Sequence, residues 1–435
     1  MRHGRFYAIS IVGGWQAIRI AFELVRSMPS CVIIVENLPV PLDRRVWQEA
    51  KALRDAGWAV SVICPATDQY PERTETIEEI RIFRHPLPIE AHSAWGFLLE
   101  YAAAFFHQFR LLFTVHRAVG FDVIQACNPP DIILMAALPW KIRGKKFVYD
   151  QHDVCPELLA AKFGDRRLLT IAAALAEKFS FKIADLVISA NDTFRQLAIS
   201  RGGKQPAEVT TVYSIPDRRL FSRAKPIDPP KVGERIIIGY VGVIGAQDGV
   251  ANIVLMAKDL IDRGIKNFQC VIIGAGPALP KVKALATQLD VADYFKFTGY
   301  LTGPDFLNTL SEFHIGIIPD PINPYNDKIS MNKVFEYAAL GLPIVAFNLT
   351  ETRRLLGEAA IFAARDDAVG LADEVARLIG NAELRRELGC RAKALADCNF
   401  DWSNEARKYV SALTALAERR PLASPGSLEK LRGIS

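Results

Sequence analysis

A cation and an acid stand three residues apart, as Lys333 and Glu336, at the start of a predicted helix. Ser330 suits the N-cap, an apolar stripe at helical spacing follows it, and Gly341 ends the helix. Lys333 therefore lies in the first turn, where the positive end of the helix dipole opposes a lysine by up to ~1 kcal/mol unless an anion binds nearby. This misfit indicates a phosphate at the helix N-terminus.

Glu336 extends the same argument from phosphate to sugar. A carboxylate accepts two hydrogen bonds from a vicinal diol, and the ribose of a nucleotide offers such a diol. Lysine for the diphosphate and glutamate for the ribose would together bind a nucleotide. An ordinary i, i+3 surface salt bridge, worth ~0.2 to 0.5 kcal/mol, explains the two residues equally well.

Length and composition exclude several other classes of protein. The chain has 435 residues, of which 50% are hydrophobic and 23% charged, and this predicts two globular domains. Its seven cysteines form no CxxC pair, so we expect neither a disulfide framework nor a structural zinc site, and we predict a cytoplasmic location. The net charge of +5 without a basic run argues against a nucleic-acid partner but is compatible with an anionic membrane surface.

Two stretches bear on membranes. Residues 1–29 begin basic and contain an apolar run but lack a cleavage site, and we interpret them as an N-terminal extension rather than a signal peptide. Residues 94–118 are rich in aromatic side chains yet carry Glu100, His107 and Arg110, which suits an interfacial helix better than a spanning one. A helix buried against its own sheet explains this stretch at least as well.

Strand and helix patterns alternate along the first half of the chain. Short apolar strands begin at Val32, Ala59, Asp122, Lys146 and Leu186, with helical patterns between them. This alternation predicts a parallel sheet of crossover units in an N-terminal, acceptor-side domain of residues 30–213.

The alternation then breaks and restarts. Residues 214–234 contain four prolines and are the predicted linker. Residues 235–398 repeat the pattern and predict a second Rossmann-like domain that binds the nucleotide. A helix at 399–419 is expected to pack back on the first domain, and the Pro/Ser/Gly-rich tail at 420–435 is expected to be disordered.

Ligands of doubly wound sheets bind beyond the carboxyl ends of the strands, and candidate residues gather there in both domains. In the second domain, backbone at Gly242, Gly245 and Gly276 can cradle phosphate, although glycine after such strands is common without a ligand. In the first domain, His152 and Asp153 suit proton transfer with a substrate hydroxyl; a capping aspartate and a packed histidine are the slightly favoured alternative. Further polar residues of that edge are Arg44, Arg45, Asn128 and Asp131.

From Cys31 to about Lys408 the chain resembles the retaining GT-B glycosyltransferases of family 4, particularly bacterial members that build exopolysaccharide or O-antigen chains. The resemblance rests on four segments: Tyr-Val-Gly-Val-Ile-Gly-Ala-Gln-Asp-Gly (240–249), Val-Ile-Ile-Gly-Ala-Gly-Pro (271–277), Phe-Thr-Gly (297–299) and Ser-Met-Asn-Lys-Val-Phe-Glu-Tyr-Ala-Ala-Leu-Gly-Leu-Pro (330–343). It implies an α/β chain with the GT-B fold, in which two Rossmann-like domains face each other across a cleft.

The resemblance also implies roles for residues. Glu336 would bind the donor ribose, Lys333 would hold the diphosphate with the glycine loop, and His152, with Asp153 beside it, would contact the donor sugar. The remaining donor-side positions are Gly242, Gly245, Gln247, Gly276, Asn326, Asp327, Ser330 and Asn332, and the acceptor-side positions are Arg44, Arg45, Asn128 and Asp131.

The chain departs from the family pattern at the first strand, where Pro39-Val-Pro41 replaces a pair of glycines, and at two places in the second domain. A second glutamate, expected eight residues before Glu336, is replaced by Lys328, so sugar recognition differs, and Asn326 and Asp327 are candidate substitutes. The basic residue usual in the glycine loop is replaced by Gln247-Asp248, which leaves more of the diphosphate charge to Lys333.

The predicted activity is retaining transfer of a sugar from a nucleotide-diphosphate donor to a saccharide or polyprenyl-diphosphate-linked saccharide in cell-surface polysaccharide synthesis, with peripheral contact at the inner face of the cell membrane. Lysine, glycine amides and helix N-termini stabilise the leaving diphosphate, and since no Asp-x-Asp follows a strand we predict no metal or other cofactor.

Three alternatives remain. A nucleotide-sugar epimerase of the same fold would need no acceptor, and a non-catalytic nucleotide-binding scaffold is motivated by Lys328 and Asp248. A dinucleotide dehydrogenase is least expected, because no G-x-G-x-x-G with an acid about 20 residues on follows either domain's first strand.

Overall fold

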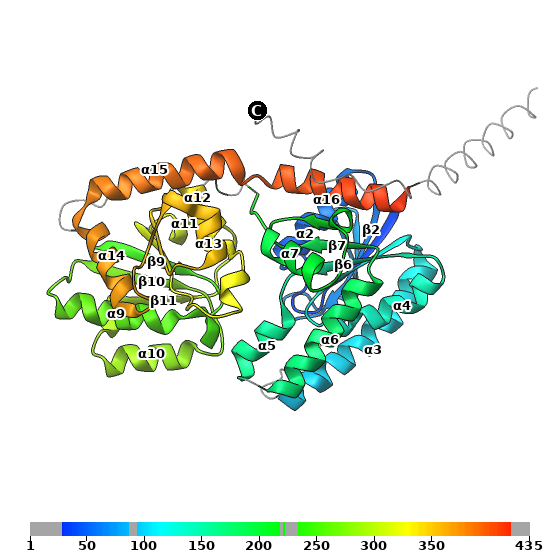
Figure 1. The fold of residues 1–435 in the computed structure, drawn as a ribbon, viewed down its shortest axis with the longest axis horizontal. Helices are drawn as coiled ribbons and strands as arrows, with labels where there is room; N and C mark the ends of the chain where they lie inside the picture. Colours follow the sequence, from blue (N-terminus) through cyan, green and yellow to red (C-terminus); the bar gives the residue numbers. More distant parts are fainter. Residues whose placement is uncertain (1–27, 87–93, 165, 218–220, 222–233, 419–435) are drawn as a thin grey trace, which may run out of the picture.

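The computed structural model describes residues 28–86, 94–164, 166–217, 221 and 234–418. The predicted disordered tail, and most of the predicted extension and linker, lie outside these residues. Two α/β domains stand side by side, each built on a mainly parallel sheet with helices on both faces (Figure 1). The predicted fold class is therefore confirmed.

The N-terminal domain is built on an eight-stranded sheet in the order β3-β4-β2-β1-β5-β6-β7-β8. Every pairing is parallel except that of β3 with β4. Its strands are β1 (Ser30–Ile34), β2 (Ala59–Pro65), β3 (Thr74–Ile77), β4 (Ile80–His85), β5 (Val123–Cys127), β6 (Lys146–Gln151), β7 (Leu186–Ser189) and β8 (Val209–Thr211). Its helices are α2 (Arg44–Asp55), α3 (Ala94–Ala118), α4 (Leu134–Ile142), α5 (Cys155–Phe163), α6 (Arg167–Ile183) and α7 (Asp192–Ser200), with 3₁₀ turns η1 (Asp131–Ile133) and η2 (Pro206–Glu208).

The C-terminal domain is built on a six-stranded parallel sheet in the order β11-β10-β9-β12-β13-β14. Its strands are β9 (Ile236–Val241), β10 (Phe268–Ile273), β11 (Phe295–Gly299), β12 (Ile315–Ile318), β13 (Ile344–Ala346) and β14 (Ala360–Phe362). Its helices are α9 (Val250–Asp262), α10 (Leu279–Gln288), α11 (Gly303–Leu310), α12 (Asn332–Leu340), α13 (Thr350–Leu356), α14 (Ala368–Gly380) and α15 (Ala382–Asn399), with 3₁₀ turns η3 (Ala246–Asp248), η4 (Ala292–Tyr294), η5 (Asn326–Lys328) and η6 (Gly357–Ala359).

Both faces of the first sheet are buried, as the nearly continuous apolar strands require. In β1, Cys31 and Ile33 pack towards α2, whereas Val32 and Ile34 pack towards the opposite face with α3 and α4. This two-sided burial places the functional residues at the strand ends rather than on a sheet face.

Helix α3 corresponds to residues 94–118, which the sequence left as either an interfacial helix or a helix buried against its own sheet. The side chains that the structure describes show which of its residues are buried. Leu112 and Val115 are fully buried and Phe105 and Phe109 partly buried against the sheet, while Phe106 is exposed. The helix therefore packs on its own domain. Among the described helices, none is both long and apolar enough to cross a bilayer.

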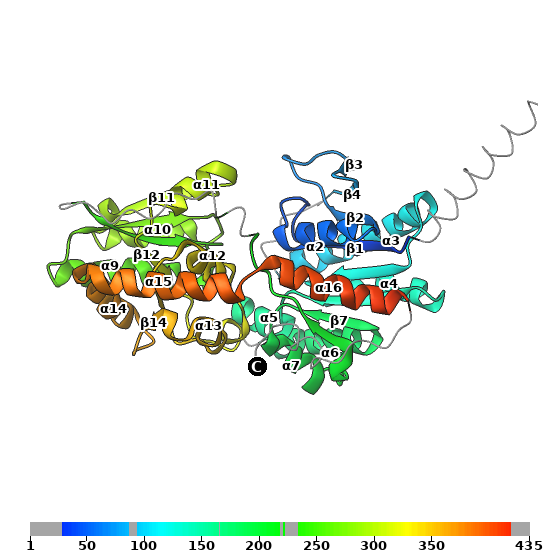
Figure 2. The same cartoon turned by 90° about the horizontal axis from the view of Figure 1, so that it is seen from above.

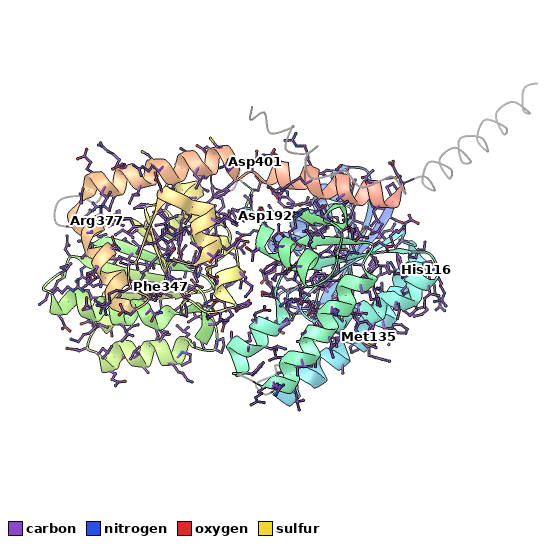
Figure 3. The ribbon with its side chains drawn as sticks, viewed as in Figure 1. His116, Met135, Asp192, Phe347, Arg377 and Asp401 are labelled. Carbon is purple, nitrogen blue, oxygen red and sulfur yellow. The ribbon has the colours of Figure 1, made fainter. Side chains whose placement is uncertain are left out.

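The last helix, α16 (Trp402–Ala417), leaves the C-terminal domain and lies along the N-terminal one (Figure 2). Asp401 caps it at the crossing point between the domains (Figure 3). Leu413 and Leu416 join the core that α2 forms with the first sheet, and the buried Tyr409 hydroxyl donates a hydrogen bond to the side chain of Gln125 in β5. The N-terminal domain is thus completed by the end of the chain.

Candidate active site between the two domains

Helix α12 carries the two residues with which the sequence argument began. It runs from Asn332 to Leu340 and ends at Gly341, whose φ of 69° is the left-handed conformation typical of a helix C-terminus. The N-cap is Met331, not Ser330 as predicted. The Ser330 hydroxyl instead accepts a hydrogen bond from the Asn191 amide of the other domain at 3.3 Å, so it serves the interface rather than the helix.

Lys333 lies in the first turn of α12, as predicted, and is buried. Its Nζ is 2.6 Å from Oδ2 of Asp320 and 4.6 Å from the ring centroid of Tyr240. Burial raises the pKa of Asp320, and the nearby Lys333 charge acts in the opposite direction. The cation at the helix N-terminus is therefore balanced by an acid that the sequence analysis missed, although Asp320 follows β12 by two residues at the expected ligand edge.

A second acid occupies the glycine loop. Oδ2 of Asp248 accepts a hydrogen bond from the Gly245 amide at 2.8 Å. Burial raises the pKa of Asp248, and Lys333 lowers it. Because the amide expected to hold a diphosphate already binds a carboxylate, a diphosphate enters this loop only if Asp248 releases Gly245.

The remaining glycines of the predicted cradle have a packing role. A Cβ at Gly274 would lie 1.9 Å from the carbonyl oxygen of Gly242, and one at Gly276 would lie 2.6 Å from that of Ile244. Both also have positive φ. The loops after β9 and β10 therefore need glycine to pack on each other, whether or not a ligand binds.

Glu336 lies on the same helix as Lys333 and faces the other domain. Its carboxylate is 2.8 Å from the Arg44 guanidinium, with 5% of the Glu336 side chain and 31% of the Arg44 side chain exposed. The structure thus brings together a predicted donor-side residue and a predicted acceptor-side residue that are far apart in sequence.

The candidate substitutes for the missing glutamate are engaged in hydrogen bonds within the C-terminal domain. The Asn326 amide donates to the carbonyl oxygens of Gln247 and Pro321, both at 2.9 Å. The Asp327 carboxylate accepts hydrogen bonds from the amide and hydroxyl of Thr350 at the start of α13. Both side chains shape the loop before α12.

Two other predicted donor residues are placed close by. Gln247 contributes the backbone carbonyl that Asn326 binds. Asn332 is exposed as the first residue of α12. Lys328, which stands in place of the expected glutamate, donates from Nζ to the carbonyl of Pro324 and lies 3.7 Å from Glu157 of the other domain.

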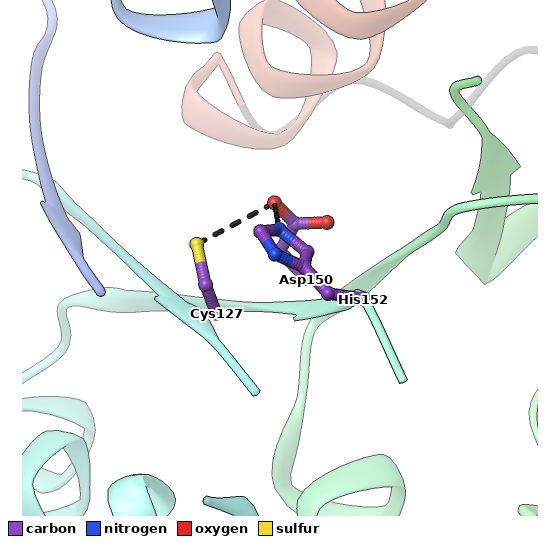
Figure 4. A group of neighbouring side chains, drawn as sticks. All are labelled: Cys127, Asp150 and His152. Carbon is purple, nitrogen blue, oxygen red and sulfur yellow. Dashed lines mark hydrogen bonds and ion pairs between the residues drawn. The ribbon is translucent and has the colours of Figure 1, made fainter. Parts of the chain in front are cut away.

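Asp150 organises the facing edge of the N-terminal domain from the end of β6. Its fully buried carboxylate accepts hydrogen bonds from Arg45 at 2.8 Å, Gln125 at 2.9 Å and His152 Nε2 at 2.8 Å, with the Cys127 thiol at 3.5 Å (Figure 4). Burial alone would raise the pKa of Asp150, but Arg45 and His152 outweigh it and hold the pKa below its ordinary value. Asp150 is therefore an ionised acceptor, and Arg45 is part of the scaffold beneath the site.

This hydrogen bond determines the tautomer of His152. Because ionised Asp150 can only accept, Nε2 of His152 carries a proton, and in the neutral form of the ring Nδ1 is the acceptor. The Asn128 side-chain oxygen accepts from the amides of His152 and Asp153 at 2.7 and 3.1 Å, and its amide donates to Asp131 at 2.8 Å. Asn128 and buried Asp131 thus hold the loop that presents His152.

Asp153 takes part in another contact between the two domains. The Tyr325 hydroxyl, from the loop before α12, donates a hydrogen bond to Asp153 Oδ1 at 2.8 Å. Burial raises the pKa of Asp153, while this hydrogen bond lowers it. Tyr325 was not predicted, since its residue type carries no signal without knowledge of what lies opposite.

Cys127, Asp150 and His152 form the one group among the described residues whose ligand atoms, all within 4.8 Å of one another, could hold a metal ion. The site fits a metal poorly, because the Arg45 guanidinium binds the same Asp150 carboxylate. Burial also raises the pKa of the Cys127 thiol well above its ordinary value, so it does not offer a thiolate. The group is a hydrogen-bond network around Asp150.

Further contacts join the domains beside this site. Arg354 of α13 is 3.1 Å from Asp192, which lies on the side of the first domain that faces the second (Figure 3). The Thr193 hydroxyl donates to buried Glu351 at 2.8 Å. The carboxyl ends of the two sheets are therefore held facing each other.

Comparison with known proteins finds one family match in each half of the chain. Residues 42–213 match the family described as glycosyl transferase 4-like domain, and residues 235–381 match the family described as glycosyl transferases group 1. Alpha-D-kanosaminyltransferase of Streptomyces kanamyceticus is 27% identical over 172 residues, which is 39% of this chain and 43% of that protein. The chain therefore matches less than half the length of this curated relative.

Solved structures resemble nearly the whole chain. Sucrose-phosphate synthase from Thermosynechococcus elongatus has a TM-score of 0.71 at 16% identity, covering 90% of this chain and 100% of that one. HepE of Anabaena, solved with UDP and glucose, has a TM-score of 0.66 at 16% identity, covering 89% and 100%. At these identities the likeness concerns the fold. The chain therefore matches two glycosyl transferase families, one in each domain, and it has the GT-B fold.

Proposed function

We propose that the protein is a retaining glycosyltransferase that moves a sugar from a nucleotide-diphosphate donor to a saccharide acceptor. The observation that carries the proposal is that Glu336, on the same helix as Lys333, binds Arg44 of the other domain, and that His152 is held by Asp150 at the sheet edge of that domain. The two family matches and the nucleotide in the HepE structure support it.

The residues divide the work of the reaction. Cleavage of the glycosyl-phosphate bond places negative charge on the leaving diphosphate, which Lys333 and the N-terminus of α12 stabilise. Glu336 accepts hydrogen bonds from the ribose hydroxyls once Arg44 has moved aside. The free Nδ1 of His152 accepts a hydrogen bond from a hydroxyl of the donor sugar, and the acceptor attacks from the side that the nucleotide leaves.

We further propose that the acceptor is lipid-linked, that the protein contacts the inner face of the cell membrane from the cytoplasm, and that the product enters cell-surface polysaccharide. Transfer is proposed to need no metal, since Lys333, backbone amides and the helix N-terminus supply the positive charge.

A donor screen tests the proposal. UDP-, GDP-, dTDP- and ADP-sugars are incubated with the protein in EDTA, with and without a lipid-diphosphate acceptor extract, and released nucleotide is followed for wild type and Glu336→Ala. Acceptor-dependent release that the variant loses is expected, with the donor anomer retained in the product. Conversion of the sugar without acceptor would indicate an epimerase, and binding without turnover would indicate a scaffold.

A further inference from the structure

The outer faces of α4 and α6 form an exposed apolar surface that the fold of the chain does not explain. On α4, Met135, Leu138 and Ile142 recur at i, i+3 and i+7 and point away from the sheet, with Ile142 79% exposed. The opposite side of α4 packs into the core, through Leu134 and Trp140 among others. A helix that is apolar on both sides is expected to have a second partner.

Helix α6 continues this surface. Leu168, Ile171, Leu175 and Phe179 recur at i, i+3, i+7 and i+11 along its exposed side, with Leu168 85% exposed. The two helices contact each other on the same side of the domain (Figure 1). We call these seven side chains the α4–α6 surface.

Positive charge borders the α4–α6 surface. Exposed cations stand at both ends of α6 and after α4, namely Arg143, Arg166, Arg167, Lys178 and Lys182. The only acid within either helix is Glu177, which is buried and bound to Arg201 at 2.7 Å. The border of this surface therefore attracts anions.

We infer that the α4–α6 surface docks on an anionic lipid bilayer. Apolar side chains on a helix lying in the interface insert ~5–10 Å past the headgroups, and flanking lysines and arginines bind the anionic headgroups. A second copy of the chain fits less well, because a twofold contact would oppose the same five cations. The inference rests on the proposed function only in that a membrane supplies the lipid-linked acceptor.

Sedimentation of the full chain with vesicles tests the inference without any turnover. Vesicles of phosphatidylcholine alone are compared with vesicles containing about one-third phosphatidylglycerol, at low and high salt. Leu168→Ser/Leu175→Ser/Phe179→Ser removes apolar groups, and Lys178→Glu/Lys182→Glu reverses charge. The matched control, Leu255→Ser/Arg386→Glu, changes an exposed apolar residue and an exposed cation on the C-terminal domain.

We expect wild type and control to pellet with the anionic vesicles only, more strongly at low salt, and both α4–α6 variants to bind at least tenfold more weakly. Failure of wild type to pellet would overturn the inference, as would equal binding by the variants, which would assign the contact to another part of the chain. A concentration-dependent dimer that the variants abolish, without vesicle binding, would identify a second copy as the partner.

The same variants separate this inference from the proposed function. With a short-chain acceptor that needs no membrane, both α4–α6 variants are expected to release nucleotide at the wild-type rate. Vesicle binding without any sugar transfer would support the docking surface and contradict the proposed transferase activity. Sugar transfer without vesicle binding would support the transferase activity and contradict the docking surface.

Discussion

The guanidinium of Arg44 binds the carboxylate of Glu336 at 2.8 Å across the interface between the two domains. The two residues are 292 positions apart in the sequence. Glu336 is the residue proposed to accept hydrogen bonds from the donor ribose. In that proposal the ribose and Arg44 compete for one carboxylate, and nucleotide binding is coupled to release of an interdomain contact.

This competition predicts that Arg44→Met tightens nucleoside diphosphate binding. A partly exposed ion pair is worth about 1 kcal/mol at most, so the dissociation constant should fall by up to about fivefold. Isothermal titration calorimetry with UDP measures the dissociation constant. The control variant is Arg54→Met, which removes an ion pair with Glu78 away from the site. Weaker binding by Arg44→Met would show that Arg44 contacts the nucleotide itself.

Lys333 is predicted to have separable roles in stability and catalysis. Lys333→Met leaves Asp320 buried without its partner and should lower the free energy of unfolding by ~3 kcal/mol or more. Lys333→Met/Asp320→Asn removes both charges, so it should recover most of that stability while nucleotide release stays at least ~100-fold below wild type. Urea denaturation and turnover, measured on the same samples, check this. Recovery of turnover in the double variant would show that Lys333 is not required for catalysis.

Asp150→Asn is predicted to disturb both the scaffold and His152. The neutral amide leaves Arg45 with Glu49, at 3.2 Å, as its carboxylate partner, which costs about 1.5–3 kcal/mol, and it no longer requires the proton of His152 to be on Nε2. The ¹⁵N NMR chemical shifts of the His152 imidazole report its tautomer, and the turnover rate reports the effect of the tautomer on catalysis. Cys127→Ala, which removes only the weak thiol donor, should keep the tautomer and cost about 1 kcal/mol. A wild-type His152 that carries its proton on Nδ1 alone would contradict the assignment.

Glu177 predicts a pH dependence of stability. Burial raises its pKa to about 8 from an ordinary value of 4.5, against the lowering effect of Arg201. The folded state therefore binds a proton that the unfolded state has released, so the free energy of unfolding decreases as pH rises from about 4.5 to about 8.

Glu177→Gln removes this titration while keeping an acceptor for Arg201. Its melting temperature should fall less than that of wild type between about pH 6 and pH 8. Glu383→Gln, at an 83% exposed side chain, is the matched control and should follow wild type. Parallel pH curves for wild type and Glu177→Gln would contradict the prediction.

The sequence predicted most of the parallel strands and the place of Lys333 and Glu336 on one helix, because both depend on local signals. Apolar strands alternating with helical patterns specify parallel crossover units, and Lys333 and Glu336 were recognised by their spacing on one helix. The N-cap was placed one residue too early because the Ser330 hydroxyl binds Asn191 of the other domain, a contact that no local pattern encodes.

Residues that act through distant partners could not be predicted in the same way. Tyr325 and Asp320 acquire their importance from Asp153 and Lys333. Arg45, which was predicted on the acceptor side, is buried in the scaffold beneath the site. Asp320 alone carried a usable signal, since it follows a strand at the ligand edge. The roles of Tyr325 and Arg45 could be predicted only with knowledge of which helices, strands and loops contact each other in the fold.

The return of α16 to the first domain bears on how the chain is made. Tyr409 reaches Gln125 across 284 positions, so the N-terminal domain emerges from the ribosome without one of its helices. Until α16 is synthesised, the apolar face that Leu413 and Leu416 cover stays open to solvent and to chaperones. Synthesis of α16, rather than of residues 30–213, is therefore the event that allows the N-terminal domain to reach its final packing.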